Sequence, residues 1–274
     1  MKKKISDTGR SNINIMIMAD MEGISGVCRA SQVSLGTYDE HYQTARKYYT
    51  WDINACVQGC FDGGAKRTIV RDAHGSGCNL IWEEMDPRGE YIQGTCRSAR
   101  MPGIDDMDAL ILLGYHAMAG TQKAILEHTM NSKAWQNCWI NGKKAGEFAI
   151  DSIIAGEHNV PVIMTSGDDK LCSEAASFIK EIVTVEVKKG LDTEGAILLS
   201  RENAHNLIRE GAAKAVRRLK KARPIKIKSP VTLTLEYVSR CLLPVNHPSI
   251  RIIDGRTFEI TAMSLEKALM QLLS

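Results

Sequence analysis

Carboxylates and imidazoles stand directly after several short stretches of this chain that are rich in apolar and β-branched residues. Asp20 and Glu22 follow the first of these stretches. His74 and His116 each lie three residues beyond a later one, and Glu147 follows a glycine at the expected start of a helix. Two carboxylates held side by side must share a proton or bind a cation. The accompanying imidazoles favour the cation and indicate a metal site.

The stretches that precede these side chains have the composition of strands buried on both faces of a sheet. We predict strands at residues 13–19, 67–71 and 109–113, although periodicity alone does not exclude a short buried helix at the first. A helical pattern at 38–61 joins the first two strands, and such a strand-helix-strand unit is right-handed with parallel strands. Ligand sites in open parallel sheets form beyond the carboxyl ends of the strands. The candidate ligands are therefore expected at one edge of one sheet.

Two imidazoles and three carboxylates are a ligand set suited to Zn²⁺, Mn²⁺ or Co²⁺. They are too many for one four-coordinate ion that keeps an open position, and suit two ions bridged by a carboxylate. Asp20, at the end of the central strand, is the expected bridge. Two ions about 3.5 to 4 Å apart can hold a shared hydroxide and polarise a carbonyl or phosphoryl oxygen. The chemistry indicated is hydrolysis.

Each of these residues, taken alone, has a structural explanation. Asp20 and Glu22 could cap a turn. His74 could be an exposed turn residue, and His116 could hydrogen-bond a backbone carbonyl. Glu147 is favoured at a helix start by the helix dipole whether or not it binds metal. Their joint placement at one edge of one sheet is what indicates a metal site.

Other acids and histidines of the chain are assigned structural roles. Asp168 or Asp169 is expected to cap the helix that follows, and Asp72 to orient His74 or to cap. Four further histidines lie in helical or turn contexts, without acids at ligand-like positions, and are interpreted as surface or structural residues: His41, His158, His205 and His247.

We predict an α/β fold with a largely parallel sheet flanked by helices and a smaller α+β C-terminal domain. The predicted parts are a flexible tail at 1–11, a metal-binding catalytic domain at 12–190 and the C-terminal domain at 191–274. The remaining predicted elements are a hairpin at 135–145 with a type I′ turn at Asn141-Gly142, a helix from 147 to about 158, a strand at 160–165, a helix at 170–181, an edge strand at 184–188, a basic helix at 200–223, strands at 231–237, 250–253 and 257–261, and a helix at 265–273.

The composition excludes several classes of protein. The 274 residues are 44% hydrophobic and 24% charged with a formal net charge of +3, which does not favour a nucleic-acid partner. No apolar run approaches the roughly 18 residues that would indicate a membrane span. None of the eight cysteines forms a C-x-x-C pair, so reduced thiols and a cytoplasmic location are expected. The basic run at 214–228 is interpreted as a solvated face, because no aromatic residues interleave it.

Several strings of this sequence resemble those of the DppA-type D-aminopeptidases, a family of dinuclear zinc peptidases. The similarity covers most of residues 13–190, in order and at matching spacing, and thins beyond. The strings are Asp20-Met21-Glu22-Gly23-Ile24-Ser25-Gly26, Asp72-Ala73-His74, Leu113-Gly114-Tyr115-His116-Ala117, Glu127-His128-Thr129-Met130, Ile140-Asn141-Gly142, Gly146-Glu147, Val160-Pro161-Val162 and Gly167-Asp168-Asp169.

The resemblance implies two Zn²⁺ per chain, held by the five residues already proposed as ligands. It adds His128 as a catalytic residue, which the sequence alone does not single out. It also implies a homo-oligomer, a decameric ring, that restricts substrates to short peptides. The chain departs from the family pattern at Glu127, whose carboxylate would raise the pKa of His128 if it approached the ring. The C-terminal region departs as well, which leaves D-stereospecificity open.

The function predicted is that of a metal-dependent aminopeptidase that hydrolyses dipeptides or other short peptides, with N-terminal D-residues as one option. One alternative is a dinuclear metallohydrolase acting on another amide, an ester or a phosphoester. A second is a metal-stabilised binding protein without turnover. Nucleic-acid binding through the basic run is a distant third.

Overall fold

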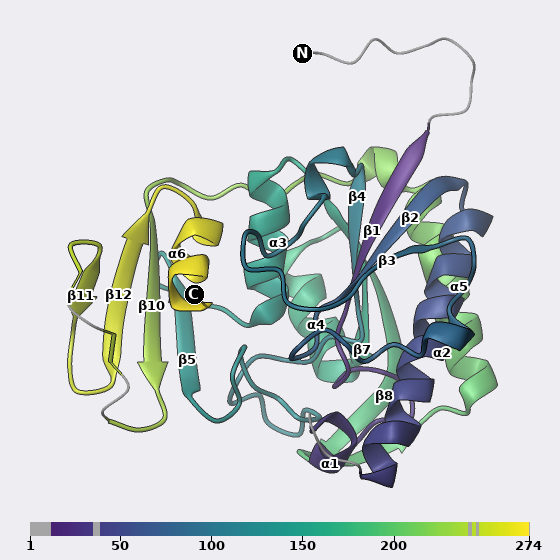
Figure 1. Ribbon diagram of the computed structural model, residues 1–274, viewed down its shortest axis with the longest axis horizontal. Helices are drawn as coiled ribbons and strands as arrows, with labels where there is room; N and C mark the ends of the chain where they lie inside the picture. Colours follow the sequence, from purple (N-terminus) through teal and green to yellow (C-terminus); the bar gives the residue numbers. More distant parts are fainter. Residues whose placement is uncertain (1–11, 35–38, 241–242, 245–246, 274) are drawn as a thin grey trace.

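Two sheets organise this protein, and the larger one runs through the middle of the body (Figure 1). The computed structural model describes residues 12–34, 39–240, 243–244 and 247–273. The predicted tail at 1–11 lies outside the described residues. The larger sheet has the order β3-β2-β1-β4-β7-β8-β9. Its strands are β1 (Ile13–Ala19), β2 (Ala65–Asp72), β3 (Glu90–Ile92), β4 (Ala109–Leu113), β7 (Val162–Asp168), β8 (Val183–Asp192) and β9 (Gly195–Leu198).

The smaller sheet is antiparallel and has the order β11-β12-β10-β5-β6. Its strands are β5 (Trp135–Ile140), β6 (Lys143–Lys144), β10 (Val231–Tyr237), β11 (Ile250–Ile252) and β12 (Thr257–Ala262). The α-helices are α1 (Ala30–Val33), α2 (Glu40–Asp62), α3 (Glu147–Glu157), α4 (Asp169–Phe178), α5 (Arg201–Arg217) and α6 (Leu265–Leu273). Short 3₁₀ turns lie at Trp82–Glu84, Ile104–Asp106 and Leu219–Lys221. None of the described helices is long and apolar enough to cross a bilayer.

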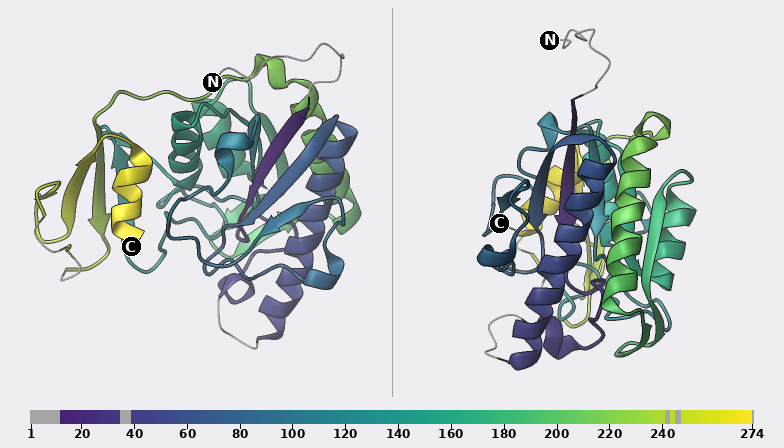
Figure 2. Two further views of the ribbon diagram at one scale, coloured as in Figure 1. Left: turned by 45° about the horizontal axis from the view of Figure 1, so that its top comes forward. Right: turned by 90° about the vertical axis from the view of Figure 1, so that its right-hand side faces the viewer.

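Strand β1 is apolar throughout because both faces of the larger sheet are covered. Ile15 and Ile17 pack into the core beneath α2 and α5, whereas Met16 and Met18 pack into the core formed with α3 and α4. Figure 2 shows α2 and α5 side by side over their face of the sheet. The predicted strand at 13–19 and the α/β fold class are confirmed.

The first six strands of the larger sheet are parallel, and their register places three strand ends at one level. Ala19, the last residue of β1, pairs with Asp72 on one side and with Leu113 on the other. The chain therefore leaves β1, β2 and β4 together at the edge where the candidate ligands were expected.

Two of the loops at this edge pack backbone to backbone. The Gly23 amide donates to Gly114 O at 2.7 Å. A Cβ on Gly23 would lie 1.9 Å from Tyr115 O, and a Cβ on Gly114, whose φ is +69°, would lie 2.3 Å from Asp20 O. Only glycine fits at either position, so the loops after β1 and β4 are held in contact.

The smaller sheet contains segments from both sides of the predicted boundary at residue 190. The β5–β6 hairpin pairs with β10, while β9 belongs to the larger sheet and α5 packs on it. Helix α6 lies between the smaller sheet and α3 (Figure 1). One apolar core continues from the α3 face into the smaller sheet. The division into domains remains a prediction, and the two sheets do not follow it.

The clearest differences from the predicted elements concern the edge strand and the basic helix, and one detailed prediction is confirmed. The strand predicted at 184–188 is not at the edge, because β9 pairs antiparallel along its outer side. The basic helix ends at Arg217 rather than 223, as a 3₁₀ turn and then Pro224 follow. The predicted hairpin turn is type I′, since Asn141 and Gly142 both have positive φ.

Candidate metal centre

All six side chains predicted for the site lie together at the carboxyl edge of the larger sheet. They form two groups, and within each group the possible ligand atoms lie within 4.8 Å of one another. The first group is Asp20, Glu22 and His74, and the second is His116, His128 and Glu147. All but His128 are buried. Their roles as ligands and catalytic residue remain predictions.

Asp20 lies between the two groups and faces both. Its Oδ1 is 3.0 Å from His74 Nδ1, and its Oδ2 is 3.5 Å from His116 Nε2. A carboxylate can bridge two ions by presenting one oxygen to each ion's ligand set. The placement of Asp20 suits that arrangement.

Each of the three imidazoles has a backbone carbonyl behind it. These contacts are His74 Nε2 to Val33 O at 2.8 Å, His116 Nδ1 to Ala117 O at 3.0 Å and His128 Nδ1 to Leu126 O at 2.9 Å. In a neutral imidazole, the nitrogen that faces a carbonyl must carry the proton. The other nitrogen then presents a lone pair, the usual arrangement of a metal-binding histidine.

The second nitrogen of each ring faces carboxylate oxygens. His74 Nδ1 lies 3.2 Å from Glu22, and Glu147 Oε1 lies 3.2 Å from His116 Nε2 and 3.5 Å from His128 Nε2. Glu22 Oε2 and His116 Nε2 nevertheless lack a well-aligned hydrogen bond among the described residues. Lone pairs that face one another repel unless a proton or a metal ion lies between them. The donor set therefore fits zinc, which binds imidazole nitrogen and carboxylate oxygen.

The pKa values of the site residues show that the buried carboxylates favour positive charge beside them. Burial opposes ionisation of Glu22, but His74, followed by His116 and His128, outweighs it and lowers the pKa of the Glu22 carboxyl. Burial likewise opposes protonation of His116, yet Glu147 and the other carboxylates raise its pKa to about 10. A metal ion would compete with these protons for the same nitrogen lone pairs.

Glu147 is placed by the start of α3 and by a contact from a loop. It is the first residue of α3, and its Oε1 accepts a hydrogen bond of 2.6 Å from the Met130 amide. Met130 has φ +60°, so the loop after His128 is turned to bring that amide to the carboxylate. The helix start and the loop together fix the Glu147 side chain.

A buried network behind the second group was missed by the sequence analysis. Asp151 lies one turn after Glu147, and the hydroxyl of Tyr115, the neighbour of His116, donates to Asp151 Oδ2 at 2.6 Å. Arg100 donates to both oxygens of Asp151 at 2.9 Å. The only indication of this network in the local sequence is that Tyr115 is the neighbour of His116.

Three other predictions about acids can be compared with the structure. Asp168 caps α4 by accepting from the Lys170 and Leu171 amides, as predicted. Asp72 contacts Asn79, whose side chain donates to His74 O, so Asp72 shapes the loop of His74 rather than its ring. The Glu127 carboxylate, which would affect His128 only if it approached the ring, accepts a hydrogen bond from the Gly120 amide at 2.6 Å.

Two of the histidines assigned structural roles have acidic partners that the sequence did not reveal. His158 lies 2.7 Å from Asp105 and 3.0 Å from Glu266. His205 lies 3.3 Å from Asp52. These partners are distant in sequence, so spacing along the chain could not reveal them.

The site opens into a cavity of about 760 Å³. Asp20, Glu22, His74, His128 and Glu147 line it, which places His128 and four of the five candidate ligands where a bound molecule can reach them. Cationic residues line other parts of the wall, namely Arg71, Arg97, Arg100 and Lys133. Cavities of this size accommodate small molecules and short peptides.

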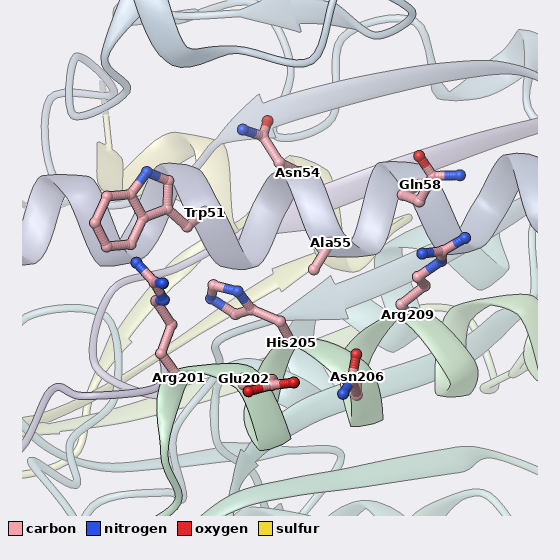
Figure 3. Close-up of a pocket in the computed structure, with 9 residues that line it drawn as sticks. All are labelled: Trp51, Asn54, Ala55, Gln58, Arg201, Glu202, His205, Asn206 and Arg209. Carbon is pink, nitrogen blue, oxygen red and sulfur yellow. The ribbon is translucent and has the colours of Figure 1, made fainter.

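A separate hollow of about 520 Å³ lies between α2 and α5 (Figure 3). The Arg201 guanidinium is 5.2 Å from the centre of the Trp51 ring there, and His205 lies between the two helices. None of the six predicted site residues lines this hollow.

Comparisons with known proteins agree with this geometry. The family model described as D-aminopeptidase matches residues 13–274. A D-aminopeptidase of Bacillus subtilis (strain 168) is 30% identical over 229 residues, which cover 83% of this chain and 82% of the relative. The solved structure of the Zn-dependent D-aminopeptidase DppA from Bacillus subtilis, a self-compartmentalizing protease, matches with a TM-score of 0.86 and 27% identity over 95% of this chain and 96% of that one. The resemblance noted in the sequence is thereby confirmed, and this chain belongs to the D-aminopeptidase family.

Proposed function

We propose that this protein is a metal-dependent aminopeptidase that hydrolyses dipeptides or other short peptides at a carboxylate-bridged dinuclear zinc site. The observation that carries the proposal is the shared setting of the three imidazoles. Each has a backbone carbonyl behind one nitrogen and carboxylate oxygens in front of the other. Membership of the D-aminopeptidase family supports the same chemistry.

Five residues would hold the two ions. Glu22 and His74 would bind one, His116 and Glu147 the other, and Asp20 both. Zinc is supported by the Zn-dependent relative, and Mn²⁺ or Co²⁺ suits the same ligands. When bound, such a pair polarises the scissile carbonyl and activates the water that attacks it.

His128 is placed to move a proton. Its side chain is 15% exposed, whereas that of His116 is 1% exposed. The two rings stack with centroids 4.0 Å apart, and the Leu126 carbonyl fixes the orientation of the His128 ring. Its Nε2, which lies 3.5 Å from Glu147 Oε1, can therefore act as acid, base or oxyanion stabiliser at the cavity surface.

The cavity favours substrates that carry charge at both ends. The carboxylate-rich ligand groups suit a free peptide amine, and the cationic wall suits a free peptide carboxylate. Arg97 and Lys133 have no ion-pair partner among the described residues, so both remain available to a substrate carboxylate. Short peptides with both termini free are the substrate class that follows.

The assembly and the location of the protein are proposed on separate grounds. The similar structure from Bacillus subtilis is a self-compartmentalizing protease, which supports a homo-oligomer, and a decameric ring, for this chain. All seven described cysteines are free, which supports a reducing and cytoplasmic location.

The test is hydrolysis of D-Ala-D-Ala beside L-Ala-L-Ala by the purified chain, metal-free and with Zn²⁺, Mn²⁺ or Co²⁺. We expect metal-dependent cleavage of at least one dipeptide, which fixes the stereochemistry. His128→Ala should keep its two metals and lose the activity. Binding of two metals without cleavage of any short peptide would reject the substrate class, and ester and phosphoester panels would then identify the bond cleaved.

A further inference from the structure

Lys188 is a buried cation directly behind the loop that carries two of the candidate ligands. It lies on β8 and is 2% exposed. Its ammonium donates to Glu22 O at 2.5 Å, Ile24 O at 3.0 Å and Val27 O at 2.6 Å. All three acceptors belong to the loop that follows β1, which connects the larger sheet to α1.

The three carbonyls match the donor capacity of the ammonium. A lysine ammonium has three N–H donors and no acceptor. Within the described part of the chain, no backbone amide donates to Glu22 O or Val27 O, so Lys188 is the donor for both. A buried carbonyl that lacks a hydrogen-bond donor costs free energy, and without the Lys188 ammonium both carbonyls would lack one in this loop conformation. Lys188 therefore fixes this loop conformation.

The donors of the same loop are held from the opposite direction. Asp52 on α2 is fully buried and accepts from the Ser25 amide at 2.8 Å and from the Ser25 hydroxyl at 2.6 Å. His205 supports Asp52 from the hollow between α2 and α5 (Figure 3). A cation holds the loop's acceptors and an anion holds its donors, so the loop is clamped between β8 and α2.

We propose that Lys188 is a positioning residue of the metal centre, whose ammonium acts as an internal cation that holds Glu22 in its ligand position. The inference rests on the proposed metal centre. Glu22 is the link, because its own carbonyl is bound by Lys188 while its carboxylate faces His74. Strand β1 ends at Ala19, so strand geometry does not reach Glu22. The Lys188 contact acts there together with the hydrogen bond from the Gly23 amide to Gly114 O.

The effect should be confined to the ion bound by Glu22 and His74. Asp20 is one residue beyond β1 and its main-chain amide is bonded to Leu113 O, so its position does not depend on the clamp. In the second group, His116 follows β4 and Glu147 opens α3, and the three hydrogen bonds of Lys188 all go to the loop after β1 instead. Loss of the ammonium should weaken one metal ion rather than both.

The experiment compares the full chain with Lys188→Met, using Lys189→Met as the matched control. Lys189 is the exposed neighbour on the same strand, so its replacement removes the same charge without touching the loop. Zinc content after dialysis and zinc affinity by chelator competition are the readouts. The parent and the control should hold two ions, and Lys188→Met should hold one tightly and bind the other on the order of 10- to 100-fold more weakly.

A double variant and a rescue separate positioning from general destabilisation. If Lys188 acts through Glu22, adding Glu22→Gln to Lys188→Met should cause little further loss of zinc affinity. In Lys188→Ala, ethylammonium should restore the second ion, whereas tetramethylammonium, which has no N–H donor, should not. If the methionine variant does not fold, Lys188→Ala prepared in ethylammonium replaces it in the experiment. Removal of the ethylammonium should then release the second zinc ion.

The outcomes distinguish this inference from the proposed function. Two ions bound with unchanged affinity by Lys188→Met would overturn the positioning role and leave the metal centre standing. Equal weakening of both ions, or additive effects of the two substitutions, would also overturn it. No zinc bound by the parent chain would reject the metal centre itself.

Discussion

Replacing Arg100 with methionine should leave a negative charge buried behind the metal centre. The Arg100 guanidinium makes two hydrogen bonds of 2.9 Å to Asp151, whose side chain is fully buried, while its own side chain is 14% exposed. Burial opposes the charge on Arg100, but Asp151 outweighs it and raises the pKa of the guanidinium. In Arg100→Met, Asp151 keeps its desolvation penalty and retains only the hydrogen bond from Tyr115.

Removing one partner of a buried ion pair costs about 3–5 kcal/mol. Because Asp151 keeps the hydrogen bond from Tyr115, we expect Arg100→Met to lower the free energy of unfolding by about 3 kcal/mol, the lower end of this range. For a chain of this size, each kcal/mol lowers Tm by about 2–3 °C, so we expect a fall of roughly 6 to 9 °C. Zinc affinity should fall as well, because Asp151 and Tyr115 orient Glu147 and His116.

The assay is thermal unfolding of the metal-free chain, followed by calorimetry, with Arg100→Met/Asp151→Asn as the control. The double variant removes both charges, keeps the side-chain volumes close and retains an acceptor for Tyr115. It should recover more than half of the lost Tm, since no charge is left unpaired. Equal destabilisation of the single and double variants would refute the stranded-charge argument and assign the effect to lost packing.

Further substitutions test the site, the cavity and a remote ion pair. Asp20→Asn should lower the zinc content more than Glu22→Gln, because only Asp20 faces both groups; elemental analysis after dialysis checks this. If the cationic wall binds the substrate carboxylate, Arg97→Ala should raise KM for a dipeptide several-fold. KM for the corresponding dipeptide amide, which has no carboxylate, should not change. For His158, burial opposes protonation, but hydrogen bonds to Asp105 and Glu266 outweigh it and raise its pKa. Its stabilising contribution, on the order of 1 kcal/mol, should therefore be complete below the unfolded pKa of about 6.5 and be lost as the pH rises through the folded value. Urea unfolding of the parent and His158→Gln at pH 5.5 and 9 measures this, and an equal difference at both pH values would contradict it.

The larger sheet and its site edge could be predicted because their signals are local. Residues 13–19 and 109–113 are buried on both faces and so read as continuous apolar runs. Parallel strands joined by right-handed crossovers place their carboxyl ends at one edge. That rule brought Asp20, His74 and His116 together without any knowledge of distances.

The remaining features depend on contacts between residues far apart in the chain. β5 pairs with β10, about ninety residues later, and the residue pattern of neither strand indicates which strand it pairs with. His128 lies in a stretch of turns that follows no periodicity, and only the family resemblance singled it out. Lys188 and Asp151 occupy regular positions of a strand and a helix, where a charged residue is ordinarily taken as solvent-facing. Their roles follow from burial, which one sequence does not reveal.

The two buried networks explain how a site with three adjacent carboxylates can be held in place before a metal ion arrives. Repulsion between Asp20, Glu22 and Glu147 would drive their backbones apart if local geometry alone positioned them. Lys188 anchors the main chain of Glu22 from β8, and Asp151, paired with Arg100, anchors the helix of Glu147. The hydrogen-bond partners of both cations are groups other than the ligand carboxylates, namely three backbone carbonyls for Lys188 and the Asp151 carboxylate for Arg100. Each cation also attracts the ligand carboxylate nearest to it, Glu22 for Lys188 and Glu147 for Arg100, so the support offsets part of the repulsion and leaves the carboxylate oxygens open to metal ions.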